Sequence, residues 1–191
     1  MNPPQGLVTL VAVLSIGTYL TLAGAIRRRA IDRGRTSVAR AGGLARWLPF
    51  GIFVPYLVIG VRQGPEVDVP TALRWVGLVL VVAGPAFSYW SASTLGLHFD
   101  LDVEVHGGHE IVVSGPYRIV RHPVYLGLAV HFIGACLATG NGLLIAGTVL
   151  VTFPALYLRA RTEEGLLRNS LGPAYDAYAR HVPMLVPLTR F

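Results

Sequence analysis

Apolar runs dominate the chain, and the first of them is long enough to cross a bilayer. Residues 7–26 carry no charged side chain, and a membrane-spanning helix needs ~20 such residues. Four further apolar runs follow, at residues 47–61, 73–95, 124–139 and 143–158. The pattern predicts an all-α membrane protein with about five transmembrane helices.

The last two apolar runs are joined only by Gly140-Asn141-Gly142. Residues of these types mark a tight turn, so we expect the last two helices to form a helical hairpin. A hairpin returns the chain to the side of the membrane from which it came. The charged residues after position 158 should therefore form a C-terminal helix on that side.

The segment 98–113 alternates polar and apolar residues around Gly107-Gly108, which predicts a short extended or β-hairpin segment. Its polar row could bind a metal or form a solvated strand face. Alternate side chains on one face of a strand lie about 7 Å apart, too far for most of them to share one ion. We expect no metal, and the row consists of His98, Asp100, Asp102, Glu104 and His106.

Composition agrees with a membrane protein. Of 191 residues, 53% are hydrophobic and only 14% are charged, whereas soluble domains carry about 25% charged residues. We divide the chain into N-terminal transmembrane helices with an arginine-rich loop (1–70) and a core (71–191). Its positive charge needs no nucleic-acid partner, because arginines near a membrane set topology and bind anionic lipid.

Arginine placement predicts the orientation. Every cationic side chain is an arginine, and they concentrate in 27–46, in 97–123 and after residue 158. Only Arg62 and Arg74 lie on the opposite side. By the positive-inside rule, the N-terminus is outside and the C-terminus is cytoplasmic. We expect an integral protein of a bacterial inner membrane, since the composition is typical of a GC-rich genome.

Arg118, Arg121 and His122 precede the fourth apolar run, and Pro123 suits the first turn of its helix. A helix N-terminus favours an anionic group, and Arg121 would add a bidentate clamp. The alternative is a simple interfacial anchor that holds the helix end at the lipid headgroups. Composition alone leaves both open.

Glu163 and Glu164 follow the fifth run and form helical pairs with Arg159 and Arg168. They fit an exposed, salt-bridged helix surface. The hairpin, however, brings them to the depth of Arg121, which favours a ligand site at the membrane surface. His131, inside a span, fits either a functional group or a hydrogen bond to a neighbouring helix.

Residues 115–127 read GPYRIVRHPVYLG and resemble the GPYR-x-x-RHP-x-Y-x-G motif of the isoprenylcysteine carboxyl methyltransferase family, which is grouped with the phospholipid methyltransferases. Upstream, residues 95–96 and 108–112 resemble the family's LG and GH-x-L-V elements. The tail resembles its EE-x-x-L, G-x-x-Y-x-x-Y and terminal V-P elements. The resemblance covers residues 75–188, and its tail elements are Glu163-Glu164, Leu167, Leu171-Gly172, Tyr175, Tyr178 and Val186-Pro187.

The resemblance implies a membrane-embedded methyltransferase that uses S-adenosyl-L-methionine as cofactor. It assigns catalytic roles to Arg121, which would orient the acceptor, and to Glu164. The chain departs from the family pattern at 97–102, where an acceptor could enter, so His98 and Asp100 are assigned to substrate binding with Arg121. The implied cofactor-binding residues are His109, Ile111, Val112, Tyr117, His122, Tyr125, Gly127, Glu163 and Glu164.

A carboxylate acceptor is favoured, because it is ionised at neutral pH and needs no general base. The expected partners are a lipophilic small molecule or lipid and the membrane itself. Alternatives are a phospholipid or amine N-methyltransferase, a sterol-reductase-like enzyme that uses NADPH, and a non-enzymatic membrane scaffold. The chain has no GxGxxG after a strand, no P-loop, no HExxH and no CxxC, which excludes the common soluble nucleotide and metal motifs.

Overall fold

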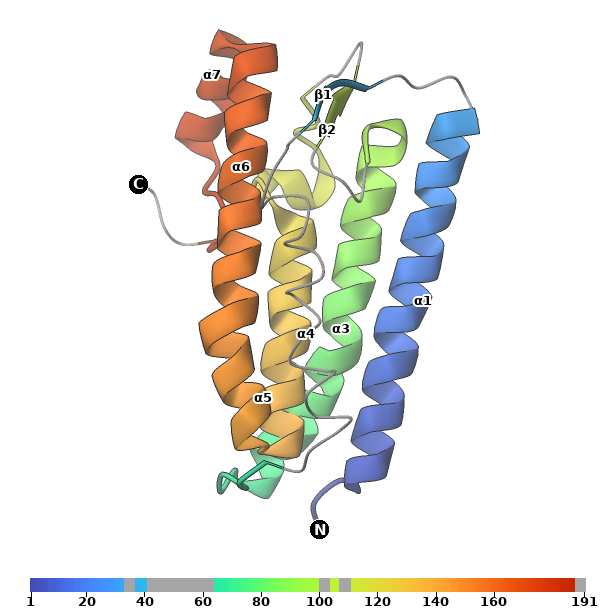
Figure 1. The fold of residues 1–191 in the computed structure, drawn as a ribbon, viewed down its shortest axis with the longest axis vertical. Helices are drawn as coiled ribbons and strands as arrows, with labels where there is room; N and C mark the ends of the chain where they lie inside the picture. Colours follow the sequence, from blue (N-terminus) through green and yellow to red (C-terminus); the bar gives the residue numbers. More distant parts are fainter. Residues whose placement is uncertain (33–36, 41–63, 100–103, 107–110, 188–191) are drawn as a thin grey trace.

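The computed structural model describes residues 1–32, 37–40, 64–99, 104–106 and 111–187. Long helices lie side by side along the molecule, with the N-terminus at one end and the C-terminal helix at the other (Figure 1). Within the described ranges, three helical stretches are long and apolar enough to span a membrane: Gln5–Asp32, Thr71–Leu95 and Gly142–Leu171. The shorter apolar helix Pro123–Thr139 lies among them.

The all-helical class is confirmed, but the count of five spans is not. Helices α1 (Gln5–Asp32), α3 (Thr71–Leu95) and α4 (Pro123–Thr139) match the first, third and fourth predicted runs. The second predicted run, 47–61, lies outside the described residues.

The predicted helical hairpin is confirmed, and its turn chemistry explains it. Helix α4 ends at Gly140, whose φ of 63° is left-handed and therefore suits glycine. Asn141 then caps α5 (Gly142–Gly147), because its side chain accepts hydrogen bonds from the backbone N–H groups of Leu143 and Leu144. The chain reverses over these residues and returns antiparallel to α4 (Figure 1).

The returning helix contains one turn of π-helix. Helix α5 passes through Thr148–Thr152 in π conformation and continues as α6 (Phe153–Leu171). Pro154 stands in the first turn of α6 and has no N–H to donate, which disturbs the hydrogen-bond register of the preceding turn.

Helices α3 and α4 pack through glycines. A Cβ atom at Gly77 would lie 2.6 Å from the carbonyl oxygen of Gly134, and one at Gly84 would meet the carbonyl oxygen of Gly127. Small residues let helix backbones approach closely in a membrane. The contact also satisfies His131, whose Nδ1 lies 2.7 Å from the carbonyl oxygen of Val81.

The predicted extended segment is present at β2 (Glu104–His106), but the hairpin is not confirmed. Strand β2 pairs antiparallel with β1 (Ser37–Arg40), from the arginine-rich loop. Asp100, Asp102 and Gly107-Gly108 lie outside the described residues.

The C-terminal helix α7 (Pro173–His181) follows Gly172, a glycine with φ of 55°. It lies beside the end of α6, at the end of the bundle where α1 finishes and the two strands pair (Figure 1). The core beneath it joins α1, α3, α4 and α6, and consists of Ile16, Tyr19, Ala23, Ala92, Phe99, Leu128, Phe132, Ala155 and Leu156.

Candidate active site

A buried polar site lies where the N-terminus of α4 meets α6 and α7. The chain approaches it through a 3₁₀ turn at Gly115–Arg118, and His122 then becomes the N-cap residue of α4. Pro123 occupies the first helical turn, where its missing N–H removes no helical hydrogen bond. This local geometry places Arg121 and His122 at the helix entrance, facing α6.

Glu164 is at the centre of the first cluster. Its side chain is only 1% exposed, and its Oε1 lies 2.6 Å from Nε and 2.5 Å from Nη2 of Arg121. Nε2 of His122 lies 3.5 Å from the same oxygen. Arg168, one helical turn further along α6, places Nη2 3.2 Å from Oε2. A buried carboxylate is thus held by neighbours of opposite charge, as its burial requires.

Glu163 belongs to a second cluster, which lies against the first. Tyr125 donates a hydrogen bond of 2.7 Å from its hydroxyl to Oε2 of Glu163. Arg159 donates from Nε to the same hydroxyl, at 2.9 Å. The ring of Tyr125 stacks on that of His122, with centroids 5.5 Å apart. His122 therefore connects the two carboxylates through its ring.

Helix α7 covers the clusters with tyrosines. Tyr178 donates from its hydroxyl to the carbonyl oxygen of Tyr117, at 2.7 Å. Arg168 joins α6 to α7, since its Nε lies 3.3 Å from Oδ1 of Asp176. Burial raises the pKa of Tyr175 and of Tyr178. The charge of Glu164 also acts to raise both pKa values, and the charge of Arg121 opposes it without cancelling the effect of burial. Both tyrosines are therefore protonated at neutral pH and can act as hydrogen-bond donors.

Three buried polar atoms among the described residues lack a hydrogen-bond partner: Nε2 of His122, Oε2 of Glu164 and the hydroxyl of Tyr175. All three belong to this site. An unsatisfied buried polar group costs about 1–3 kcal/mol, and each such group in a native structure needs an explanation. A polar ligand that hydrogen-bonds to them would remove this cost.

The structure brings six of the twelve predicted site residues together. Arg121, His122, Tyr125, Glu163 and Glu164 form the two clusters described above. Tyr117 is buried beside them, and burial raises its pKa.

Other predicted residues lie elsewhere. Gly127 faces α3, where an added Cβ would meet the hydroxyl of Ser88, so its position has a packing explanation. Ile111 and Val112 are half-buried in the segment before the 3₁₀ turn. His98 is half-buried in a 3₁₀ turn at the end of α3. His109 and Asp100 lie outside the described residues.

Two buried residues of the site, Arg159 and Tyr175, were not predicted from the sequence. Arg159 is only 5% exposed and contacts Tyr125, although its spacing from Glu163 is equally typical of an exposed helix surface. The sequence signal that could have indicated its burial is that Arg159 directly follows the apolar run 143–158. Tyr175 is buried, and its α7 periodicity alone does not show which face packs on α6. Arg118, in contrast, is exposed, as an interfacial anchor would be.

The chain is similar in sequence to proteins of one known family. The sequence model of the "Isoprenylcysteine carboxyl methyltransferase (ICMT) family" matches residues 75–169, from α3 to the end of α6. A "Probable protein-S-isoprenylcysteine O-methyltransferase" of Oryza sativa subsp. indica is 30% identical over 125 residues, 64% of this chain and 65% of the relative. The "Protein-S-isoprenylcysteine O-methyltransferase" of Xenopus laevis is 30% identical over 128 residues, 66% of this chain and 44% of the relative.

A bacterial relative has a different kind of name. The "Nickel-cobalt-cadmium resistance protein NccN" of Alcaligenes xylosoxydans xylosoxydans is 28% identical over 132 residues, 69% of this chain and 57% of the relative. The chain spans less than two thirds of the length of these relatives. Through residues 75–169, which contain both carboxylate clusters of the site, the chain belongs to the isoprenylcysteine carboxyl methyltransferase family.

Proposed function

We propose that the chain is a membrane-embedded methyltransferase that uses S-adenosylmethionine and acts at the cytoplasmic face on a lipophilic carboxylate. The observation that carries the proposal is the pair of neighbouring carboxylates in α6, Glu163 and Glu164. Glu164 is buried, and buried polar atoms without hydrogen-bond partners lie in the same site. Family membership and the names of the relatives support the same activity.

The polar groups of the site suit the proposed donor. S-adenosylmethionine carries a sulfonium, an ammonium group and ribose hydroxyls, and when bound it supplies an electrophilic methyl group. Glu163 and Oε2 of Glu164 would accept hydrogen bonds from its ammonium or hydroxyl groups. Oε2 has no hydrogen-bond partner within the chain, although it forms an ion pair with Arg168. Nε2 of His122 and the hydroxyl of Tyr175 would complete this set. The proposed wall further contains Ile111, Val112, Tyr117 and Tyr125. His109, which lies outside the described residues, stays a prediction from the family resemblance.

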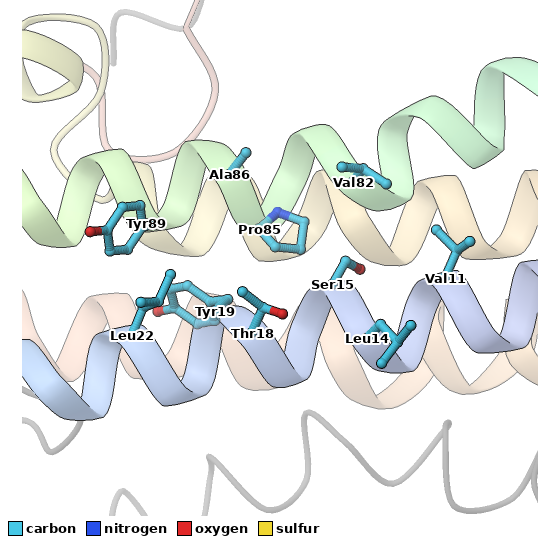
Figure 2. Close-up of a pocket in the computed structure, with 10 residues that line it drawn as sticks. All are labelled: Val11, Leu14, Ser15, Thr18, Tyr19, Leu22, Val82, Pro85, Ala86 and Tyr89. Atoms are coloured by element: carbon cyan, nitrogen blue, oxygen red, sulfur yellow. The ribbon is translucent and has the colours of Figure 1, made fainter.

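An apolar groove between two of the long helices offers a place for the acceptor. It has a volume of about 490 Å³ and lies between α1 and α3, with side chains of both helices facing one another (Figure 2). Its lining is almost wholly apolar, as a hydrocarbon chain requires. The residues that line it include Val11, Leu14, Leu22, Val82, Pro85 and Ala86.

The groove leads toward the polar site through Tyr19. Tyr19 lines the groove, is 4% exposed, and interacts electrostatically with Arg159. Arg159 in turn bonds to Tyr125, the partner of Glu163. A cation that interacts both with a residue of the groove and with the proposed donor site could orient a carboxylate whose tail lies in the bilayer. We therefore propose Arg159 as the acceptor-orienting arginine, in place of Arg121.

These residues would act mainly by positioning and by excluding water. A carboxylate is already ionised at neutral pH, so no residue needs to remove a proton from it. Arg159 is buried and Tyr125 is half-buried, so the site would have a low dielectric, which favours a transfer that removes one positive and one negative charge. Holding the two reactants in line would supply much of the acceleration.

The arginine pattern supports the cytoplasmic face. Arg27, Arg28 and Arg29 lie near the end of α1, and Figure 1 places that end of the helix at the same end of the bundle as β1, β2 and α7. The proposed site thus lies at the arginine-rich end of the bundle, which the positive-inside rule assigns to the cytoplasm.

Transfer of a labelled methyl group tests the proposed function. Membranes that contain the protein would be incubated with tritiated S-adenosylmethionine, and lipid extracts would then be treated with base. A carboxyl methyl ester releases its label as volatile methanol under these conditions, whereas an N-methyl group retains it. Base-volatile label that disappears in Glu164→Gln is the expected result. Label that is stable to base would point to an amine acceptor, and incorporation equal to that of membranes without the protein would contradict the proposal.

A further inference from the structure

Among the described residues, the side chain of Arg121 makes its hydrogen bonds and ion pair to two places: Glu164 of α6 and the backbone at the end of α7. The side chain of Arg121 is 10% exposed, and its Nε and Nη2 both contact Oε1 of Glu164. Nη1 donates to the carbonyl oxygen of Ala179, at 2.9 Å, and to that of Val182.

The two carbonyl groups lie at the C-terminal end of α7. The last carbonyls of a helix have no intrahelical partner and carry partial negative charge, so a guanidinium stabilises them as a cap. Arg121 therefore caps α7 from another part of the chain, 58 and 61 residues away from its two partners.

The backbone continues the same contact beyond α7. The N–H of Arg121 donates to the carbonyl oxygen of Pro183 at 2.9 Å, and the N–H of His122 donates to that of Met184 at 3.1 Å. The segment Ala179–Met184 is thus attached to the entrance of α4 by both side-chain and backbone hydrogen bonds.

The pairing with Glu164 links this attachment to the carboxylate. Arg121 occupies Oε1. The opposite oxygen Oε2 has no hydrogen-bond partner, although Nη2 of the part-exposed Arg168 lies 3.2 Å from it as an ion-pair partner. An acceptor carboxylate at Arg121 would have to displace Glu164 or release α7. The contacts thus argue against a role for Arg121 in binding the acceptor.

We propose that Arg121 is a positioning residue that holds the segment Ala179–Met184 over the site and orients Glu164 so that Oε2 is available to a ligand. The first half of this proposal depends only on contacts within the chain. The second half rests on the proposed function, because it assumes that the ligand at Oε2 is the methyl donor.

Hydrogen exchange in the donor-free protein tests the first half. In Arg121→Gln, the backbone amides of α7 and of the residues up to 187 should exchange about tenfold faster, since the loss of charge-assisted hydrogen bonds is worth this much. Arg118→Gln is the matched control, because Arg118 is exposed three residues earlier and should leave the exchange unchanged. Unchanged protection in Arg121→Gln would overturn the proposal.

Donor and acceptor kinetics test the second half. We expect Arg121→Gln to raise the KM for S-adenosylmethionine about tenfold and to leave the KM for the acceptor within about twofold of wild type. Arg121→Lys retains the charge but not the fork geometry, so it should restore part of both the protection and the donor KM. A raised acceptor KM with an unchanged donor KM would make Arg121 an acceptor ligand instead.

A second variant covers the case in which Arg121→Gln does not fold. Tyr178→Phe removes the hydrogen bond to Tyr117 and leaves the pair of Arg121 and Glu164 intact. It should speed exchange in α7 with little effect on the donor KM, so the two variants separate holding of the segment from orientation of the carboxylate. If Tyr178→Phe weakened donor binding as much as Arg121→Lys does, the pair of Arg121 and Glu164 would have no separate role in orienting the carboxylate. Because exchange is measured without donor, failure of the proposed function would not change its result.

Discussion

The hydroxyl of Tyr125 donates to Glu163 at 2.7 Å and accepts from Arg159 at 2.9 Å, so one phenol joins a half-exposed carboxylate to a buried guanidinium. Tyr125 and Arg159 come from different helices of the hairpin, and His122 stacks on the phenol ring. These contacts therefore link the entrance of α4 to Arg159.

Removal of this hydroxyl should loosen the second cluster. In Tyr125→Phe, Glu163 loses a hydrogen bond and Arg159 loses an acceptor, and we expect S-adenosylhomocysteine to bind about tenfold more weakly by calorimetric titration. Tyr157→Phe is the matched control, because that tyrosine lies on α6 and is 49% exposed. Equal affinities of Tyr125→Phe and wild type would show that the phenol does not support the donor site.

Arg159→Gln should affect the acceptor rather than the donor. If Arg159 orients a carboxylate, its loss should lower kcat/KM for the acceptor about a hundredfold, with donor affinity changed by less than about fivefold. Arg161→Gln, an exposed neighbour on the same helix, should behave as wild type. A loss confined to donor affinity would instead place Arg159 in the donor site.

Obstruction of the apolar groove should likewise affect the acceptor and not the donor. Ala86 lines the groove, whereas Ala83 is an exposed residue of α3 that does not line it. Ala86→Phe should raise the acceptor KM about tenfold by competing for space with the hydrocarbon chain, and Ala83→Phe should not. Steady-state kinetics on both variants would check this. If the two behave alike, the acceptor enters elsewhere.

Close packing of α3 on α4 should make their glycines sensitive to a single methyl group. Gly84→Ala would place its Cβ against the backbone of α4, and overpacking of this kind costs about 1–3 kcal/mol. The midpoint of thermal unfolding in detergent should fall. Gly17→Ala in α1 meets no atom within 4 Å, so its midpoint should stay the same or rise. A Gly84→Ala protein as stable as wild type would contradict the packing described.

The hairpin shows which features the sequence could predict. Its turn depends on three adjacent residues, Gly140 to Gly142, whose conformational preferences are local. Once the turn is known, helix length fixes the depth at which Glu163 and Glu164 return. The convergence of these carboxylates with Arg121 and His122 could therefore be predicted from local signals alone.

Features that depend on distant packing were not predictable. Whether Arg159 faces water or protein depends on α4 and the core beside α6, and its helical spacing is the same in both cases. The partner of β2 is β1, more than 60 residues earlier, and a local alternating pattern cannot identify it. The contacts of Arg121 with Ala179 and Val182 likewise join segments that no motif relates.

The most direct test of the account is whether the paired carboxylates form a donor site. S-adenosylhomocysteine would be titrated calorimetrically into detergent-purified wild type and Glu164→Gln, with NADPH as a parallel titrant and Glu164→Asp as the charge-preserving control. The account predicts binding of S-adenosylhomocysteine alone, at least about tenfold weaker in Glu164→Gln because a buried acceptor for a cationic group is lost. Binding of NADPH instead, or equal affinity of wild type and Glu164→Gln, would contradict it.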